Sequence, residues 1–294
     1  MSKTLMSLRG RGARRAVALL SSAALVAGVA VIGSPASAAS KAGGTLIIVS
    51  FDDQIELDPT RTYVGRDIAF MNSFWVRNLV SYVHKPGAAG SGIVGDLATN
   101  TGVPSNNAKT WKFTLRPGVT WEDGKPVTCA DVKYGVSRVF ADTIITGGPA
   151  YLQAWLNGVT DAGYKGPYEA NTPAAQAAFD AAVKCSNKNR TITFTLNKSV
   201  ADFNYLATYG VISPVQKSKD TGEGYDVKPQ STGPYKIAEN SANQLRLVRN
   251  KYWNPKTDPL RHNYPAKIIV KMGFEQNAFE QLMMSDSAQS QYAV

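Results

Sequence analysis

The sequence predicts an α/β protein, and two observations favour this class. Short segments of alternating or continuously apolar residues, typical of strands, are interleaved with segments whose apolar residues recur every three or four positions, typical of helices. The chain has 294 residues, 44% of them hydrophobic, which is enough to bury one large core or two smaller ones. Strands mixed with isolated helices favour an α/β or α+β arrangement over an all-helical or all-strand one.

Residues 1–38 have the pattern of a secretory signal. A basic segment over 9–15 precedes an uncharged apolar run over 16–32, and the small residues Ala36-Ser37-Ala38 suit signal peptidase. We therefore expect a cleaved signal peptide over 1–38 and a secreted, extracytoplasmic protein. A permanent membrane anchor is the alternative, since the apolar run reaches only the short limit for a span. No cysteine follows the run, so we expect no lipid attachment.

The composition of the chain argues against nucleic acid and metal binding. The segment 1–38 carries five basic residues and no acid, so its removal lowers the formal net charge from +10 to +5, and we expect no nucleic acid partner. With only two cysteines and two histidines, we expect no metal and no other cofactor. Export would place Cys129 and Cys185 in an oxidising compartment, where we expect a disulfide between them. Two buried free thiols are the alternative.

The first half of the exported chain predicts strands and helices in alternation. The continuous β-branched run over 45–51 predicts a strand covered on both faces. Over 67–82, apolar residues spaced by three and four predict one amphipathic helix. Strict alternation over 111–116 predicts a half-buried strand. Thr128 and Asp131 form a capping-box-like pair, which predicts the start of the next helix.

The second half of the chain continues the same mixture of elements. Thr172-Pro173 is a favourable helix start, and the helix is expected to run to Cys185. A short helix is expected over 201–209 and another over 276–284. The segments that predict strands, by alternation or by apolar runs, are 191–196, the turn and strand 231–237, 245–250 and 266–272.

Four motifs, taken in order, resemble one protein family. Residues 111–132, WKFTLRPGVTWEDGKPVTCADV, resemble the "W-x-F-x-L-R-x-x-V-x-W-x-D-G-x-P-x-T-A-x-D-V" signature of the extracellular solute-binding proteins, family 5, of ABC importers. This is the oligopeptide-, dipeptide- and nickel-binding type. Cys129 stands where the family usually has Ala, which fits the expected disulfide. The other three motifs are Leu57-Asp58-Pro59, STGPY over 231–235 and LVRNKYW over 247–253.

The resemblance implies a fold and a domain organisation. The family has a periplasmic-binding-protein-like bilobal fold (type II), in which two lobes close on a ligand. By resemblance, 39–82 and 199–272 would form a discontinuous first lobe, and 83–198 a small inserted domain. Family members are much longer, so we expect this chain to be truncated, with 273–294 starting the crossover into a missing second lobe.

The resemblance also implies a function. We expect a monomeric, non-enzymatic substrate-binding subunit that captures oligopeptides or similar small solutes and delivers them to the permease subunits of an ABC importer. Peptide binders of the family hold the ligand through main-chain hydrogen bonds from both lobes. Aligned by resemblance, the ligand-side residues are Tyr63, Gly65, Tyr151, Tyr209, Thr232 and Gly233, with ordinary turn or core packing as the alternative at each.

A search for catalytic motifs gives no enzyme candidate. The sequence contains no Gly-x-Ser-x-Gly elbow, His-Glu-x-x-His, P-loop or Gly-x-Gly-x-x-Gly. His84 and His262 lie in polar loop contexts, so we expect surface histidines rather than catalytic bases. Asp52 and Asp53 are adjacent at a strand end and would point to opposite faces. The alternative function is a secreted hydrolase or a cell-wall glycan-binding module that uses Trp and Tyr side chains.

Overall fold

The computed structural model describes residues 42–50 and 56–285. The expected signal peptide over 1–38, the Asp52-Asp53 pair and the end of the expected crossover segment lie outside the described residues. In the described part of the chain, no helix has both the length and the apolar character needed to cross a membrane.

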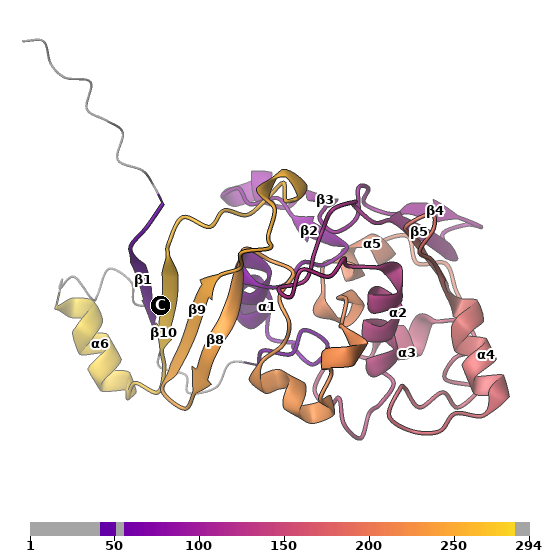
Figure 1. Cartoon of the computed structure of the whole chain (residues 1–294). Helices are drawn as coiled ribbons and strands as arrows, with labels where there is room; N and C mark the ends of the chain where they lie inside the picture. The colour runs from indigo at the N-terminus through magenta and orange to yellow at the C-terminus, as the bar shows by residue number, and fades with distance from the viewer. Residues whose placement is uncertain (1–41, 51–55, 286–294) are drawn as a thin grey trace, which may run out of the picture. The chain divides into compact units, whose positions relative to one another are not determined.

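The first of two larger sheets joins strands from both ends of the chain. Its order is β1 (Thr45–Val49), β10 (Lys267–Lys271), β9 (Gln244–Arg249) and β8 (Tyr235–Ser241), with β1 parallel to β10 and the other neighbours antiparallel. Figure 1 shows these four strands side by side. β1 is an edge strand in which only Val49 is buried, so the expected cover on both faces is not found.

The helix α1 (Gly65–Phe74) packs on this first sheet. Leu247 and Ile268 come from adjacent strands and share a hydrophobic cluster with Met71 of α1 and the following Trp75, all nearly inaccessible to solvent. The strands expected near 235–237, 245–250 and 266–272 are therefore confirmed. Alternation of buried and exposed residues along these strands is what orients their apolar side chains toward α1.

The second sheet is antiparallel and carries its own core. Its order is β4 (Val103–Ser105), β5 (Thr110–Thr114), β7 (Thr191–Thr195) and β6 (Val183–Ser186). α2 (Cys129–Arg138) and α4 (Pro173–Ala182) contribute to the hydrophobic cluster formed with this sheet. The strands expected over 111–116 and 191–196 are confirmed. The two sheets, with helices packed on them, make the described chain the mixed α/β protein that the sequence predicts.

Shorter elements complete the described chain. The remaining strands, β2 (Val80–Tyr82) and β3 (Ile93–Gly95), pair antiparallel. The remaining α-helices are α3 (Tyr151–Trp155), α5 (Phe203–Leu206) and α6 (Gln276–Met284). Short 3₁₀ helices are η1 (Gly87–Gly90), η2 (Gly210–Ile212), η3 (Lys217–Lys219), η4 (Gly222–Val227) and η5 (Pro255–Thr257). The short α5 and the helix α6 lie where the sequence predicts them.

The prediction of one helix over 67–82 is wrong for its second half. α1 ends at Phe74, and residues 80–82 form strand β2 instead. The carbonyl of Trp75, which a longer helix would use for its next turn, accepts hydrogen bonds from the amides of Thr232 and Gly233, each at 3.0 Å. A contact from a distant segment therefore ends the helix and frees residues 75–82 to change direction.

The start of α2 and the disulfide agree with the sequence. The Thr128 hydroxyl accepts from the Asp131 amide, and the Asp131 carboxylate accepts from the Thr128 amide at 2.8 Å, so the capping box is confirmed. Cys129 and Cys185 form a disulfide that joins the first turn of α2 to β6. The helix expected to reach Cys185 instead ends at Ala182, because residues 183–186 pair with β7.

Candidate functional site

A cavity of about 340 Å³, which we call the tyrosine cavity, opens between α1 and β2. Its volume is at the lower end of the range for small-molecule sites, about 300–1,000 Å³. Three tyrosines from separate segments contribute to it. The lining residues are Tyr63, Gly65, Ile68, Ala69, Asn72, Ser73, Ser81, Tyr82, His84, Thr208 and Tyr209.

One face of α1 forms a wall of the cavity. Gly65, Ile68, Ala69, Asn72 and Ser73 are spaced by three and four along the helix, so they share one side of it. Met71, on the opposite side, is buried against the first sheet. The helix thus joins the core with one face and presents the other to the cavity.

Tyrosine side chains surround the mouth of the cavity. Tyr63 is 58% exposed and Tyr82 is 44% exposed, although both are large and partly apolar. Tyr151, at the start of α3, shares a hydrogen bond with the Tyr63 hydroxyl, and this contact raises the pKa of Tyr151. The Tyr82 ring lies 6.3 Å from the ring of Tyr205 on α5. Exposed tyrosines around a cavity are typical of surfaces that bind a ligand through both ring faces and hydroxyls.

Beside the cavity, the side-chain amides of Asn72 and Asn78 form hydrogen bonds with another segment of the chain. The Asn78 amide donates to Asn72 Oδ1 at 3.0 Å and to the carbonyl of Thr208 at 2.5 Å. The Asn72 amide also donates to the Thr208 carbonyl, at 3.3 Å, and the Ser213 hydroxyl donates to Asn78 Oδ1. These bonds fix the end of α1 against the segment that carries Tyr209.

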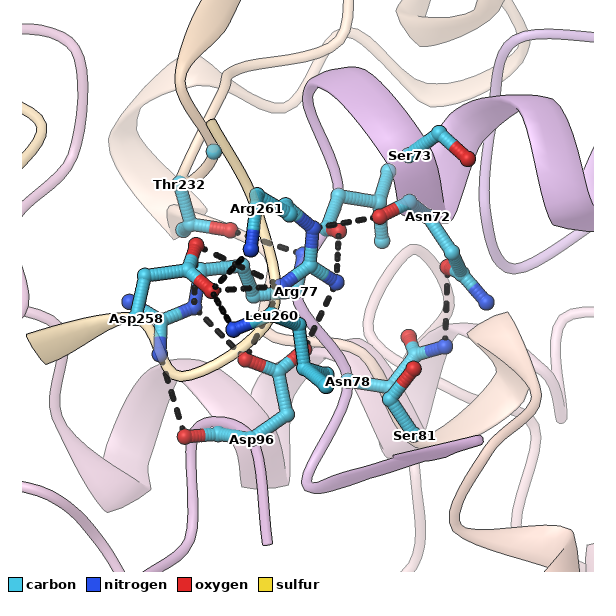
Figure 2. Close-up of polar contacts among 12 residues, drawn as sticks. Asn72, Ser73, Arg77, Asn78, Ser81, Asp96, Thr232, Asp258, Leu260 and Arg261 are labelled. Carbon is cyan, nitrogen blue, oxygen red and sulfur yellow. Dashed lines mark hydrogen bonds and ion pairs between the residues drawn. The ribbon is translucent and has the colours of Figure 1, made fainter. Parts of the chain in front are cut away.

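A buried network of two arginines and two aspartates lies behind this wall (Figure 2). Asp96 accepts from Arg77 Nε at 2.8 Å and from Arg261 Nη2 at 2.7 Å. Arg261 also pairs with Asp258 at 3.3 Å, and all four side chains are at most 1% exposed. Burial alone would raise the pKa of Asp258, but the charges of Arg261 and Arg77 outweigh it and hold that pKa at about 2.

Arg261 links this network to the cavity wall. Its Nε donates to the main-chain carbonyl of Asn72 and its Nη2 to that of Val76, at 3.2 Å. These carbonyls belong to the end of α1 and the residues just after it, where helical partners run out. A cation at this position also suits the helix dipole.

Two lining residues have shifted titrations: burial, with Tyr209 and Tyr205 nearby, raises the pKa of Tyr82, whereas the pKa of His84 shifts the other way. Desolvation and the positive charge of Arg261 lower the pKa of His84, and its ring donates to the carbonyl of Leu260. The imidazole is therefore neutral at pH 7. Among the described residues, no group of three or more His, Cys, Asp or Glu side chains is placed to hold a metal ion.

The turn that leads to Tyr63 is fixed by close backbone contacts. A Cβ at Gly148 would lie 2.5 Å from the carbonyl oxygen of Thr60, and one at Gly210 would collide with the carbonyl of Pro59. Only glycine permits these approaches. They hold the turn 57–62 against the segments that precede Tyr151 and follow Tyr209, so the three tyrosines share one supporting structure.

The residues expected from the family resemblance fall into two groups. Tyr63, Gly65 and Tyr209 line the cavity, and Tyr151 joins it through Tyr63. Thr232 and Gly233 are buried elsewhere: both amides bond to Trp75, and the Thr232 hydroxyl accepts from the Arg77 amide at 3.0 Å. In the described residues these two positions shape the end of α1 rather than line the cavity.

Sequence reasoning did not place Tyr82, His84 or Tyr205 at the site. Tyr82 was expected on the apolar face of a helix that ends eight residues earlier, whereas His84 is an exposed histidine, as expected, and in addition lines the cavity. The concentration of aromatic residues in irregular segments was the available signal for Tyr205. It does not indicate which tyrosines meet.

Comparisons with known proteins agree on one family. The family model described as bacterial extracellular solute-binding proteins, family 5 middle, matches residues 92–291. The oligopeptide-binding protein OppA of Bacillus subtilis is 30% identical over 152 residues, which cover 51% of this chain and 27% of that protein.

Solved structures show the same fold. The clavulanic acid biosynthesis oligopeptide binding protein 2 is 33% identical, with a TM-score of 0.75 over 84% of this chain and 43% of that chain. Listeria monocytogenes OppA bound to peptide is 17% identical, with a TM-score of 0.61 over 83% of this chain and 45% of that chain, and supports the fold alone. This chain therefore spans less than half the length of these relatives and matches part of a periplasmic-binding-protein-like fold.

Proposed function

Because this chain belongs to the bacterial extracellular solute-binding proteins of family 5, we propose that it captures oligopeptides or similar small solutes for an ABC importer. The solute would pass unchanged to permease subunits in the membrane. One observation carries the proposal. Tyr63 and Gly65 were expected to face a ligand together with Tyr209, far away in the sequence, and all three line one cavity. Relatives named for oligopeptide binding support the class of solute.

The proposal includes a mechanism of capture. The described residues would supply one side of a two-lobed clamp, with 39–82 and 199–272 as the first lobe and 83–198 as the inserted domain. A ligand that contacts both lobes has higher affinity for the closed state and so shifts the population toward it. No bond of the solute is broken, which is why we propose no catalytic residue.

The proposal also covers the cellular location of the protein and its oligomeric state. The signal peptide over 1–38 would be removed on export, and the monomeric protein would act on the outer side of the cytoplasmic membrane without a lipid anchor. The Cys129–Cys185 disulfide supports an oxidising compartment, since such bonds are rare in the reducing cytosol.

A binding panel tests the proposal against glycan binding and hydrolysis. Thermal unfolding and calorimetry would be measured with random di- to pentapeptides and with cell-wall oligosaccharides. We expect a response to peptides that Tyr63→Ala weakens. Tyr264→Ala, which removes a similarly exposed tyrosine outside the cavity, should leave it unchanged. A response to oligosaccharides alone, or release of cleaved product from either panel, would overturn the proposal.

A further inference from the structure

The tyrosine cavity carries no charge of its own. Its polar lining consists of hydroxyls, one carboxamide and the neutral imidazole of His84, and none of its lining residues is Asp, Glu, Lys or Arg. Its apolar lining includes Ile68 and Ala69. A group that enters this space leaves water and meets rings, methyl groups and neutral dipoles.

Two groups of charged residues near the cavity are paired internally. Arg261 lies behind the wall, but its guanidinium is shared between Asp96 and Asp258 and is fully buried. Arg66 and Asp67 lie on α1 beside the lining residues, and Arg66 Nε pairs with Asp67 Oδ1 at 3.0 Å. Among the residues that the structure describes, the lining of the cavity therefore offers no carboxylate to a ligand ammonium and no cation to a ligand carboxylate. Burial of an unpaired charge is strongly unfavourable.

The size and the walls of the cavity favour one ring-sized group. Rings of Tyr63, Tyr82 and Tyr209 contribute from three segments of the chain. A space of about 340 Å³ accommodates one large side chain with some water, but not a whole peptide. Because the His84 ring donates to the Leu260 carbonyl, its other nitrogen is left as an acceptor.

We propose that the tyrosine cavity is a subsite for one uncharged, ring-bearing side chain of the bound solute, and that it discriminates against charged side chains. This inference rests on the proposed function, which it narrows from small solutes in general to peptides that carry a neutral aromatic residue. The single juxtaposition behind it is a set of three tyrosines and an uncharged polar wall around a cavity whose described lining carries no charged side chain.

The test uses side-chain analogues and needs no knowledge of the natural ligand. N-acetyl-L-phenylalaninamide, N-acetyl-L-lysinamide and the α-amide of N-acetyl-L-glutamic acid would be titrated into the purified protein and followed by NMR. We expect the phenylalanine analogue to bind at least tenfold more tightly than either charged analogue. Equal affinities, or tighter binding of a charged analogue, would overturn the inference, as would the absence of binding by all three.

A filled cavity provides the site-specific control. Ala69 is an exposed helical residue in the lining, so Ala69→Trp places a ring in the cavity while leaving the core of α1 unchanged. We expect this variant to lose at least tenfold in affinity for the phenylalanine analogue. Ala177→Trp, at an exposed position on α4 outside the cavity, should keep wild-type affinity. Equal affinity of Ala69→Trp and wild type would place the analogue elsewhere and refute the subsite.

The same variants separate this inference from the proposed function. If peptides bind but Ala69→Trp does not change the preference for aromatic peptides, the capture function stands and the subsite fails. If the phenylalanine analogue binds in the cavity while no peptide binds, the subsite stands and the function fails.

Discussion

Arg138 and Asp58, 80 residues apart in the sequence, form a buried bidentate ion pair. Arg138 Nη1 lies 3.0 Å from Asp58 Oδ1, and Nη2 lies 2.8 Å from Oδ2, with both side chains fully inaccessible. Burial alone would lower the pKa of Arg138, but the charge of Asp58 outweighs it and raises that pKa. The pair fastens the turn that precedes Tyr63 to the end of α2, and so supports the mouth of the cavity.

Removal of the Asp58 charge should destabilise the protein markedly. Asp58→Asn keeps the size of the side chain but leaves Arg138 with Asp220 as its remaining carboxylate partner, at 3.1 Å. We expect a loss of about 3 kcal/mol in the free energy of unfolding, measured by urea denaturation. The control is Lys165→Ala, which breaks a solvent-exposed pair with Glu169 and should cost less than about 1 kcal/mol. Similar losses in the free energy of unfolding for the two variants would show that the buried pair contributes no more stability than an exposed pair.

Much of the secondary structure follows from local sequence, whereas the site depends on distant contacts. Strict alternation predicts β5 and β7, since a half-buried strand imposes that period directly. The helix expected to continue past Phe74 stops because Thr232 and Gly233 occupy the carbonyl of Trp75. No periodicity near residue 75 reveals a partner so far along the chain.

The same reason limits prediction of the cavity. Aromatic residues in irregular segments indicate that a binding surface exists, and the family resemblance adds where its loops lie. Tyr82 and His84 enter the cavity only because α1 ends early and β2 forms. Arg261 pairs with Asp96, which lies 165 residues earlier in the sequence, and the pairing neutralises both charges. No local sequence pattern predicts this contact.

Glu56 should make the free energy of unfolding fall as the pH rises from 4.5 to about 8. Burial, with the adjacent Asp226 carboxyl, raises the pKa of Glu56 from 4.5 to about 8. Between pH 4.5 and 8 the unfolded chain has lost a proton that the folded protein keeps, so the free energy of unfolding decreases with pH. Glu56→Gln removes this dependence, and we expect the variant to gain stability relative to wild type at pH 8 but not at pH 4.5.

Melting temperatures across this pH range provide the measurement for Glu56. Glu223→Gln serves as the matched control because Glu223 is exposed. A stability difference between Glu56→Gln and wild type that is constant from pH 4.5 to pH 8 would contradict the assignment.

Loss of the disulfide should lower the free energy of unfolding while the protein still unfolds in one cooperative transition. The bond joins positions 56 residues apart, which corresponds to about 4 kcal/mol in the chain-entropy model. We expect the double variant Cys129→Ala/Cys185→Ala to show a lower midpoint in a single cooperative urea transition. Reductant should shift wild type toward the same midpoint and leave the variant unchanged. A reductant effect on the variant, or none on wild type, would argue against the bond in solution.

Peptide binding at the tyrosine cavity is the most direct test of the proposed capture of peptides by this chain. Isothermal titration of wild type, Tyr209→Ala and Tyr264→Ala with an aromatic pentapeptide, such as Ala-Ala-Phe-Ala-Ala, compares a cavity residue with an exposed tyrosine outside it. We predict weak, saturable binding by wild type and by Tyr264→Ala, a loss of at least tenfold for Tyr209→Ala, and recovery of the peptide intact. Equal affinity for all three proteins, or recovery of a cleaved peptide, would contradict the account.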